Sequence, residues 1–226
     1  MDKEAHFTTP TNAVTLISYT KTAGDDNKSL EDIIAYCARV SNPSNQMNTE
    51  SNSKLIAYLI KNGHWSPFEM VSICLEMNTT RDIARQILRH RSFSFQEFSQ
   101  RYAVADLGFT VREARMQDPK NRQNSLETDD EELQREWEHY QNQVRQISGQ
   151  AYEWALSRGI AKEQARVVLP EGNTMSRLYV NGTLRSWIHF IEVRSKKCTQ
   201  KEHREIAIQC AEAIAPIFPL IDKCVQ

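Results

Sequence analysis

The sequence predicts an α+β fold in which long helices pack on a small, mostly antiparallel sheet. Residues 71–78 alternate apolar and polar side chains, which is the pattern of a strand with one buried face. Several longer segments instead repeat apolar residues at spacings of three and four, which is the pattern of helices. The 226 residues are enough for one domain with a sizeable core. We therefore expect a single domain over residues 1–226, with residues 1–13 as a loose lead-in.

The first elements are a strand and two helices. Residues 14–19 are predicted to form a short strand. Ser29 can cap a helix over residues 30–40, and the acidic residues that follow it favour the positive end of the helix dipole. A second helix is predicted over residues 53–61 and ends at Gly63.

After the alternating strand, residues 81–91 return to the helical period. Its predicted buried stripe consists of Ile83, Ala84, Ile87 and Leu88. Arg81, Arg85 and Arg89 fall at positions i, i+4 and i+8, so one face of the same helix carries a row of cationic donors.

A polar connection over residues 117–130 leads into a long helix at 131–157, which Gly159 ends. Its apolar stripe consists of Leu133, Trp137, Tyr140, Val144, Ile147, Ala151 and Trp154. We expect this stripe to form a helix-on-helix core. The next elements are a short helix at 162–169 stopped by Pro170, a strand at 174–180 and a helix at 184–194. Thr199 and Glu202 have capping-box spacing, so the last helix is predicted to begin there and to run to about residue 218.

Composition and short motifs exclude several classes of protein. The net charge of −1 gives no global basic field for nucleic acid, and no apolar stretch approaches the length of a membrane span. The five cysteines are far apart and form no Cys-x-x-Cys pair, so we expect no metal site and a reducing, cytoplasmic setting. No Gly-x-Gly-x-x-Gly, no Walker-type loop and no Gly-x-Ser-x-Gly elbow occurs, so any nucleotide must be bound by side chains.

The most informative segment is the run 89–102, RHRSFSFQEFSQRY, which we call the basic run. It holds three arginines, a histidine, a carboxylate and three serines. Like charges repel, so this grouping suggests an anion among them, and arginine forks match phosphate oxygens in pairs. The alternative is a solvated basic surface.

Three further segments stand out. Residues 64–69, HWSPFE, precede the alternating strand, where an ordinary turn with a buried tryptophan and phenylalanine is the alternative. Residues 165–170, ARVVLP, place Arg166 at an apolar helix end, where a surface or ion-paired arginine is the alternative. Arg185 and His189 lie at i and i+4 of one helix, where a satisfied histidine on an amphipathic helix is the alternative.

Together these segments resemble the signature of the flavin-dependent thymidylate synthases (ThyX). That signature has Arg-His-Arg followed by serines and ends in Ser-x-Arg-Tyr, as in residues 89–102. The other segments follow the family order, beginning with Ala-Arg-Val-Ser at residues 38–41. The resemblance extends from about residue 14 to residue 218. It implies a ThyX-like single domain with a non-Rossmann flavin site.

The resemblance implies a methyltransferase that makes dTMP from dUMP. Methylenetetrahydrofolate is the implied carbon donor, NADPH the implied reductant and FAD the implied cofactor. It further implies a homotetramer whose active sites are shared between subunits, with no nucleic-acid or membrane partner. No enzyme nucleophile is expected, and Ser99 is interpreted as a substrate-binding residue because no histidine or lysine base stands beside it in the motif.

The implied dUMP site comprises Gln86, Arg89, Glu97, Ser99, Gln100, Arg101, Arg166 and Arg194. Arg89, Arg101 and Arg166 suit the phosphate. Arg194 would lie against the uracil ring as a fixed cation and act as the catalytic residue.

The implied FAD site comprises Ser41, His64, Ser66, Glu69, Arg89, His90, Arg91, Glu97, Thr183, Arg185 and His189. Arg91 and Arg185 can neutralise the pyrophosphate, and the cationic setting would favour reduced flavin. Gln96, Gln100, Thr183 and His189 depart from residues found in many or some members, but each change is polar for polar.

Two other readings remain open from the sequence. A cysteine-dependent thymidylate synthase needs a thiolate among cations, and only Cys198, close after Arg194, approaches that condition. A nucleic-acid- or phosphate-binding module could use the arginines and phenylalanines of the basic run.

Overall fold

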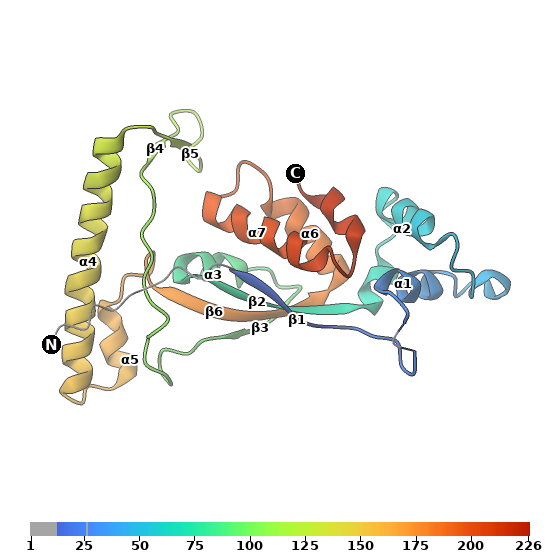
Figure 1. Cartoon of the computed structure of the whole chain (residues 1–226), viewed down its shortest axis with the longest axis horizontal. Coiled ribbons are helices and arrows are strands. Elements are labelled where there is room, and N and C mark those ends of the chain that lie inside the picture. Colours follow the sequence, from blue (N-terminus) through green and yellow to red (C-terminus); the bar gives the residue numbers. More distant parts are fainter. Residues whose placement is uncertain (1–12, 26) are drawn as a thin grey trace. The chain divides into compact units, whose positions relative to one another are not determined.

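The computed structural model describes residues 13–25 and 27–226, and its fold is α+β, as predicted. The strands are β1 (Val14–Tyr19), β2 (Ser72–Thr80), β3 (Ser94–Glu97), β4 (Arg115–Gln117), β5 (Ser125–Glu127) and β6 (Met175–Thr183). The helices are α1 (Leu30–Ala38), α2 (Asn52–Lys61), α3 (Arg81–Ile87), α4 (Glu131–Ser157), α5 (Lys162–Ala165), α6 (Leu184–Arg194) and α7 (Lys201–Ile214) (Figure 1). Short 3₁₀ helices are η1 (Pro43–Asn45), η2 (Ser66–Met70), η3 (Arg166–Val168) and η4 (Pro219–Cys224).

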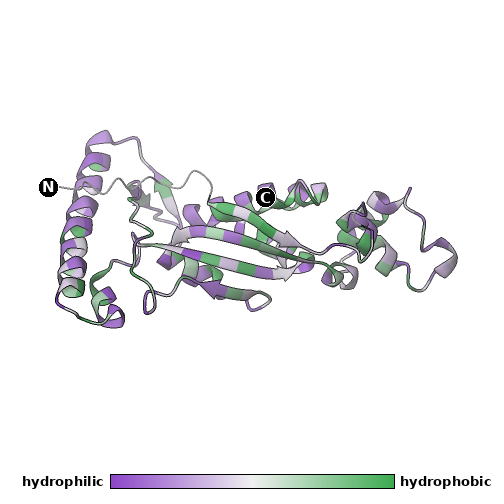
Figure 2. Ribbon diagram, turned by 60° about the horizontal axis from the view of Figure 1, so that its bottom comes forward, coloured by the Kyte–Doolittle hydropathy of each residue, from purple (hydrophilic) through white to green (hydrophobic). Residues whose placement is uncertain are grey.

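The main sheet has the strand order β1-β2-β6-β3. Strands β1 and β2 are antiparallel, with Val14 opposite Met77 and Tyr19 opposite Ile73, and an irregularity interrupts the register near Leu16. The predicted alternation of β2 is confirmed, because Ile73, Leu75 and Met77 are fully buried while the residues between them are partly exposed. The alternation is visible as changing colour along the strands in Figure 2.

The chain divides into two compact units. Unit 1 comprises Asn78–Arg89 and Gln96–Leu178 together with Ala13, among the described residues. Unit 2 comprises Val14–Met77, His90–Phe95 and Tyr179–Gln226. The expectation of one domain stays a prediction, and residues 1–12 of the predicted lead-in lie outside the described residues.

The core of unit 2 lies beneath α6. Trp187 is fully buried, and its indole Nε1 donates to the Ile73 carbonyl at 3.0 Å. The Phe93 ring lies 4.5 Å from the Trp187 ring and 5.9 Å from the Phe190 ring, measured between centroids. A side chain at Gly182 would collide with the Phe93 ring. The aromatic part of the basic run is therefore packed into this core.

In unit 1 the long helix α4 packs through a different face from the one predicted. Tyr152 and Ala155 are buried against Ala165, and the Tyr152 hydroxyl accepts a hydrogen bond from the Ala105 amide at 3.0 Å. The predicted core stripe is instead exposed within the chain, in particular at Trp137, Tyr140, Val144, Ile147 and Trp154. The prediction of the helix is confirmed, and no helix of the described chain covers the predicted stripe, so the helix-on-helix core stays a prediction.

Three local predictions also differ from the structure. The helix predicted over residues 81–91 ends at Ile87, and the basic run contains strand β3. The polar connection at 117–130 forms a small hairpin of β4 and β5. The predicted capping box of the last helix does not form. The Thr199 hydroxyl instead donates to the Val193 carbonyl, and the Glu202 carboxylate accepts from the Gln200 side-chain Nε2. Within the described ranges, no helix is long and apolar enough to cross a membrane.

Candidate active site

The predicted ligand residues separate by unit. Unit 1 contains the residues predicted for dUMP except one: Gln86, Arg89, Glu97, Ser99, Gln100, Arg101 and Arg166. Unit 2 contains most of those predicted for FAD: Ser41, His64, Ser66, Glu69, His90, Arg91, Thr183, Arg185 and His189. Arg89 and Glu97, which were predicted for both ligands, lie at or next to points where the chain passes between the units. Arg194 is the exception, a predicted dUMP residue in unit 2.

Three predicted FAD residues from distant parts of the sequence form one cluster in unit 2. Thr183 caps α6 by accepting a hydrogen bond from the Ser186 amide at 3.4 Å. The same hydroxyl donates to Glu69 Oε2 at 2.6 Å, and an Arg185 terminal nitrogen donates to Glu69 Oε1 at 3.1 Å. One carboxylate therefore ties η2 to the beginning of α6.

Two more predicted residues meet at the other end of α6. The Arg194 Nε donates to His90 Nε2 at 2.9 Å. Burial, together with the neighbouring charges of Arg194 and His189, lowers the pKa of His90 to about 4. His90 is therefore neutral at neutral pH, as an acceptor of this hydrogen bond must be.

The outer face of α6 remains open to solvent. Arg185 and His189 are exposed, whereas Trp187 and Ile188 between them are fully buried. The confirmed i, i+4 spacing places two donors on one face of this helix. His64, Ser66 and Arg91 are exposed as well, so a ligand can reach each of them.

In unit 1, Glu97 and Gln100 occupy defined positions near β6. Glu97 Oε1 accepts from the Ser176 hydroxyl at 2.9 Å and lies 3.5 Å from the Arg81 guanidinium. Gln100 is 3% exposed, and its buried Nε2 atom has no hydrogen-bond partner among the described residues. A buried amide donor left unpaired costs roughly 1–3 kcal/mol, so this position is suited to a ligand that supplies an acceptor.

Other predicted dUMP residues, in the basic run and in η3, are exposed or partly exposed, and some of them already have partners within unit 1. Arg101 forms an exposed ion pair with Glu163 at 3.2 Å, and the Lys162 ammonium donates to the Tyr102 carbonyl at 3.1 Å. Ser99 is exposed, and its carbonyl accepts from the Ala103 amide at 2.9 Å. Arg166, in η3, is partly exposed. Arg101 and Arg166 remain accessible to an anion.

Sequence reasoning gave no role to His203, a fully buried histidine on α7 whose ring lies 6.3 Å from the His90 ring. A single histidine inside an amphipathic helix carries no motif that distinguishes it from a core residue. The same holds for Ser176, which donates to Glu97 but belongs to no recognised segment, whereas Arg81 was placed in the predicted row of cationic donors without a ligand role.

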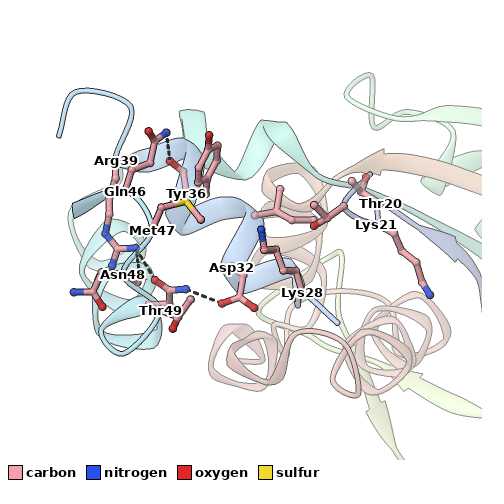
Figure 3. A pocket seen from close by; sticks show the side chains of 13 residues that line it. Thr20, Lys21, Lys28, Asp32, Tyr36, Arg39, Gln46, Met47, Asn48 and Thr49 are labelled. Atoms are coloured by element: carbon pink, nitrogen blue, oxygen red, sulfur yellow. Dashed lines mark hydrogen bonds between the residues drawn. The ribbon is translucent and has the colours of Figure 1, made fainter. Parts of the chain in front are cut away.

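A cavity of about 370 Å³ lies in unit 2 beside α1 and α2 (Figure 3). Arg39, on its wall, donates to the Asn48 carbonyl and to Asn52 Oδ1, both at 2.6 Å. Asn52 Nδ2 in turn donates to Asp32 Oδ1 at 2.7 Å. The residues that line this cavity include none of the predicted ligand residues, and these three polar side chains bond one another.

Comparison with known proteins identifies the family. The family described as "Thymidylate synthase complementing protein" matches residues 15–220. A probable flavin-dependent thymidylate synthase of Paramecium bursaria Chlorella virus 1 is 48% identical over 211 residues, covering 93% of this chain and 97% of that protein. A flavin-dependent thymidylate synthase of Synechocystis sp. is 53% identical over 196 residues, covering 87% of this chain and 89% of that protein.

A solved structure is also similar. The UMP/dUMP methylase PolB from Streptomyces cacaoi, bound with 5-Br dUMP, has a TM-score of 0.79 and 27% sequence identity, covering 93% of both chains. The chain belongs to the flavin-dependent thymidylate synthase family.

Proposed function

We propose that this protein catalyses the reductive methylation of dUMP to dTMP, with methylenetetrahydrofolate as carbon donor and NADPH as reductant. The observation that carries the proposal is the joining of predicted site residues at both ends of α6. Glu69, Thr183 and Arg185 meet at its beginning, and His90 and Arg194 meet at its end. Membership of the thymidylate synthase family supplies the reaction.

The exposed donors of unit 2 fit FAD. Arg91 and Arg185 are accessible cations for the pyrophosphate, and His64, Ser66 and His189 are accessible polar groups for the ribityl chain and the flavin ring. Glu69 and Thr183 would hold Arg185 in place beneath the cofactor. When bound, FAD would carry reducing equivalents from NADPH to the pyrimidine.

The donors of unit 1 fit a nucleotide phosphate and base. Arg89, Arg101 and Arg166 would neutralise the phosphate, and the unpaired Gln100 amide would find its acceptor on the nucleotide. Arg194 uses its Nε for His90, so its two terminal nitrogens would be the donors directed at the uracil ring. A cation held there stabilises negative charge that develops on the ring.

We interpret Ser99 as a binding residue and expect no covalent link between enzyme and substrate. Cys198, the candidate nucleophile of the cysteine-dependent reading, is exposed just after α6. A Cys198→Ser variant should retain full dTMP synthesis. Loss of activity together with loss of a covalent adduct with a fluorinated dUMP analogue would favour the cysteine-dependent reaction.

We also propose that the enzyme is a homotetramer with shared sites and that α4 supplies part of its interface. The stripe at 137, 140, 144, 147, 151 and 154, which is exposed except at the partly exposed Ala151, alternates spacings of three and four, which is the repeat of a coiled-coil seam. A helix with this repeat is suited to packing along another helix, and a second copy of the chain supplies one. A cytoplasmic setting remains our expectation from the cysteine spacing, and all five cysteines are unpaired thiols.

The decisive experiment is to record the visible spectrum of the purified protein and then to repeat it anaerobically with NADPH, with and without dUMP. A flavin band that bleaches and responds to dUMP, followed by dTMP formation when methylenetetrahydrofolate is added, is the expected result. UMP should be tested in parallel, since the similar PolB structure is that of a UMP/dUMP methylase. A colourless protein that does not take up FAD but binds single strands in a salt-dependent way would support the nucleic-acid-binding alternative instead.

A further inference from the structure

Behind the Arg194–His90 pair lies a second buried histidine. His203 on α7 is 0% exposed, and its ring meets the His90 ring edge-on, at 6.3 Å between centroids and an interplanar angle of 86°. Phe190 contacts both rings, at 4.9 Å from His90 and 5.7 Å from His203. Phe93 lies 6.4 Å from His90. The His90 ring is therefore enclosed by three side chains from two helices and the basic run.

The hydrogen bond to Arg194 restricts His90 further. Because Arg194 Nε is a donor, His90 Nε2 must accept, so the His90 proton must lie on Nδ1. A half-turn of the ring about its Cβ–Cγ bond would bring the Cε1–H group to the place of Nε2, leave the Arg194 Nε without an acceptor and break the bond. The packing that prevents this rotation consequently controls where the Arg194 guanidinium lies.

The burial of the two rings also keeps His90 and His203 neutral. Burial, together with the charge of Arg194, lowers the pKa of His203 to about 3. With the pKa of His90 also lowered, Arg194 is the one cation of this trio at neutral pH. Two neutral rings beside a cation avoid the repulsion that a protonated histidine would introduce.

We propose that His203 is a positioning residue that holds the His90 ring in the orientation that directs Arg194 at the uracil ring. The role of Arg194 in this statement rests on the function proposed above. His203 is too buried to touch a substrate, so it acts through the side chains around it, and the His90 ring is the one that contacts Arg194. Replacing it with a small side chain would leave space into which the His90 ring can turn, and misplacement of a catalytic group by about 1 Å can reduce a rate by up to about 100-fold.

The kinetic test uses three variants. His203→Ala should lower kcat for dTMP formation about tenfold, with the KM for dUMP within about twofold of the wild type and the flavin content unchanged. His203→Gln, which retains most of the volume and remains neutral, should recover most of the lost kcat. Cys210→Ala removes an equally buried side chain from the same helix and should behave as the wild type. Should His203→Ala not fold, His203→Cys, which also carries a small side chain, takes its place with the same expectation.

A second readout does not depend on catalysis. In protein labelled with ¹³C at the histidine Cδ2 atoms, the chemical shift of His90 reports which ring nitrogen carries the proton. The wild type and Cys210→Ala should show the Nδ1–H tautomer, and His203→Ala should shift toward the other tautomer. Adding His203→Ala to Arg194→Ala should lower kcat no further than Arg194→Ala alone.

Two results separate this proposal from the proposed function. A folded His203→Ala enzyme with wild-type kcat and an unchanged His90 shift would overturn the positioning role while dTMP synthesis by the wild type stands. A wild-type protein that makes no dTMP would overturn the function instead, and the His90 shift alone would then decide whether His203 fixes the Arg194–His90 pair.

Discussion

Helices α4 and α6 are both amphipathic, yet they use their apolar faces in opposite ways. On α6, Leu184, Trp187 and Ile191 are fully buried within unit 2. On α4, Ile147 is 68% exposed and Trp154 is 61% exposed within unit 1. The apolar period therefore fixes that a segment is a helix, but it does not reveal whether the partner of that helix lies in the same chain.

The two helices therefore differ in what their solvent-exposed faces can bind. Because α6 is anchored by its buried face, its open face can present Arg185 and His189 in fixed positions, and its last turn holds Arg194 against His90. Because α4 leaves a heptad-spaced stripe uncovered, it is suited to assembly. In the function proposed above, α6 therefore organises ligand residues and α4 supplies part of the interface between subunits.

The largest expected effect is on assembly. Ile147→Glu combined with Trp154→Glu places two charges in the exposed stripe of α4, and burying unpaired charge in an interface is costly. We expect the tetramer to be replaced by smaller species in light scattering and dTMP synthesis to be lost with it. Gln146→Glu, on an exposed position of α4 outside the stripe, is the control and should remain a tetramer. A double variant of wild-type size would show that α4 is not an interface.

The same type of residue should behave differently in α6. Trp187→Ala removes a fully buried indole and its bond to the Ile73 carbonyl, and such core truncations cost about 3–5 kcal/mol. Denaturant titration monitored by circular dichroism should show this loss in the free energy of unfolding. Trp154→Ala should leave the helical content of the subunit unchanged. An equal loss of secondary structure in both variants would remove the distinction between the two helices.

Acid should destabilise unit 2 through its buried histidines. The folded pKa of His203, about 3, lies below the ordinary value of 6.5, so the unfolded chain binds more protons between these values. Stability is therefore full above about pH 6.5 and falls as the pH drops toward 3, by about 2 kcal/mol at pH 5 from His203 alone. His203→Gln should flatten this part of the curve, whereas Cys210→Ala should shift the whole curve and keep its slope.

The sequence predicted well what depends on local pattern. The bounds of β1 and α6 were predicted at the observed residues, and Ser29 caps α1 as expected, in a capping box with Asp32 that was not predicted. The motif residues around Glu69 and Arg185 were also identified, although the carboxylate that joins them is a contact across 116 positions of the chain. Local pattern could indicate these residues but not the bond between them.

What the sequence could not predict depends on tertiary partners. The strand β3 lies inside a run whose charges obscure its alternation, and it forms because the sheet offers an edge. The burial of Gln100 and His203 has no local signal, since a glutamine in a polar run and a histidine in a helix are usually exposed or partly exposed. That no part of the described chain covers the α4 stripe could not be predicted either, because its periodicity does not say where the partner of the helix lies.

The smallest expected effect concerns the first turns of the two helices. The Asp130 carboxylate caps α4 by accepting from the Glu132 and Leu133 amides, at 3.1 and 3.0 Å, and Thr183 caps α6. Asp130→Ala and Thr183→Ala should each cost about 1 kcal/mol of stability, because each leaves helix amides without their acceptor.

Only Thr183→Ala should also weaken FAD binding, because its hydroxyl additionally positions Glu69, which holds Arg185. Asp130→Asn and Thr183→Ser retain an acceptor oxygen and serve as the matched controls for the two caps. Titration of the apoprotein with FAD, followed by flavin fluorescence, measures the difference. If Thr183→Ala loses stability but binds FAD like Asp130→Ala, Thr183 is only a helix cap, and the contrast between a structural helix and a ligand-organising helix does not extend to their first turns.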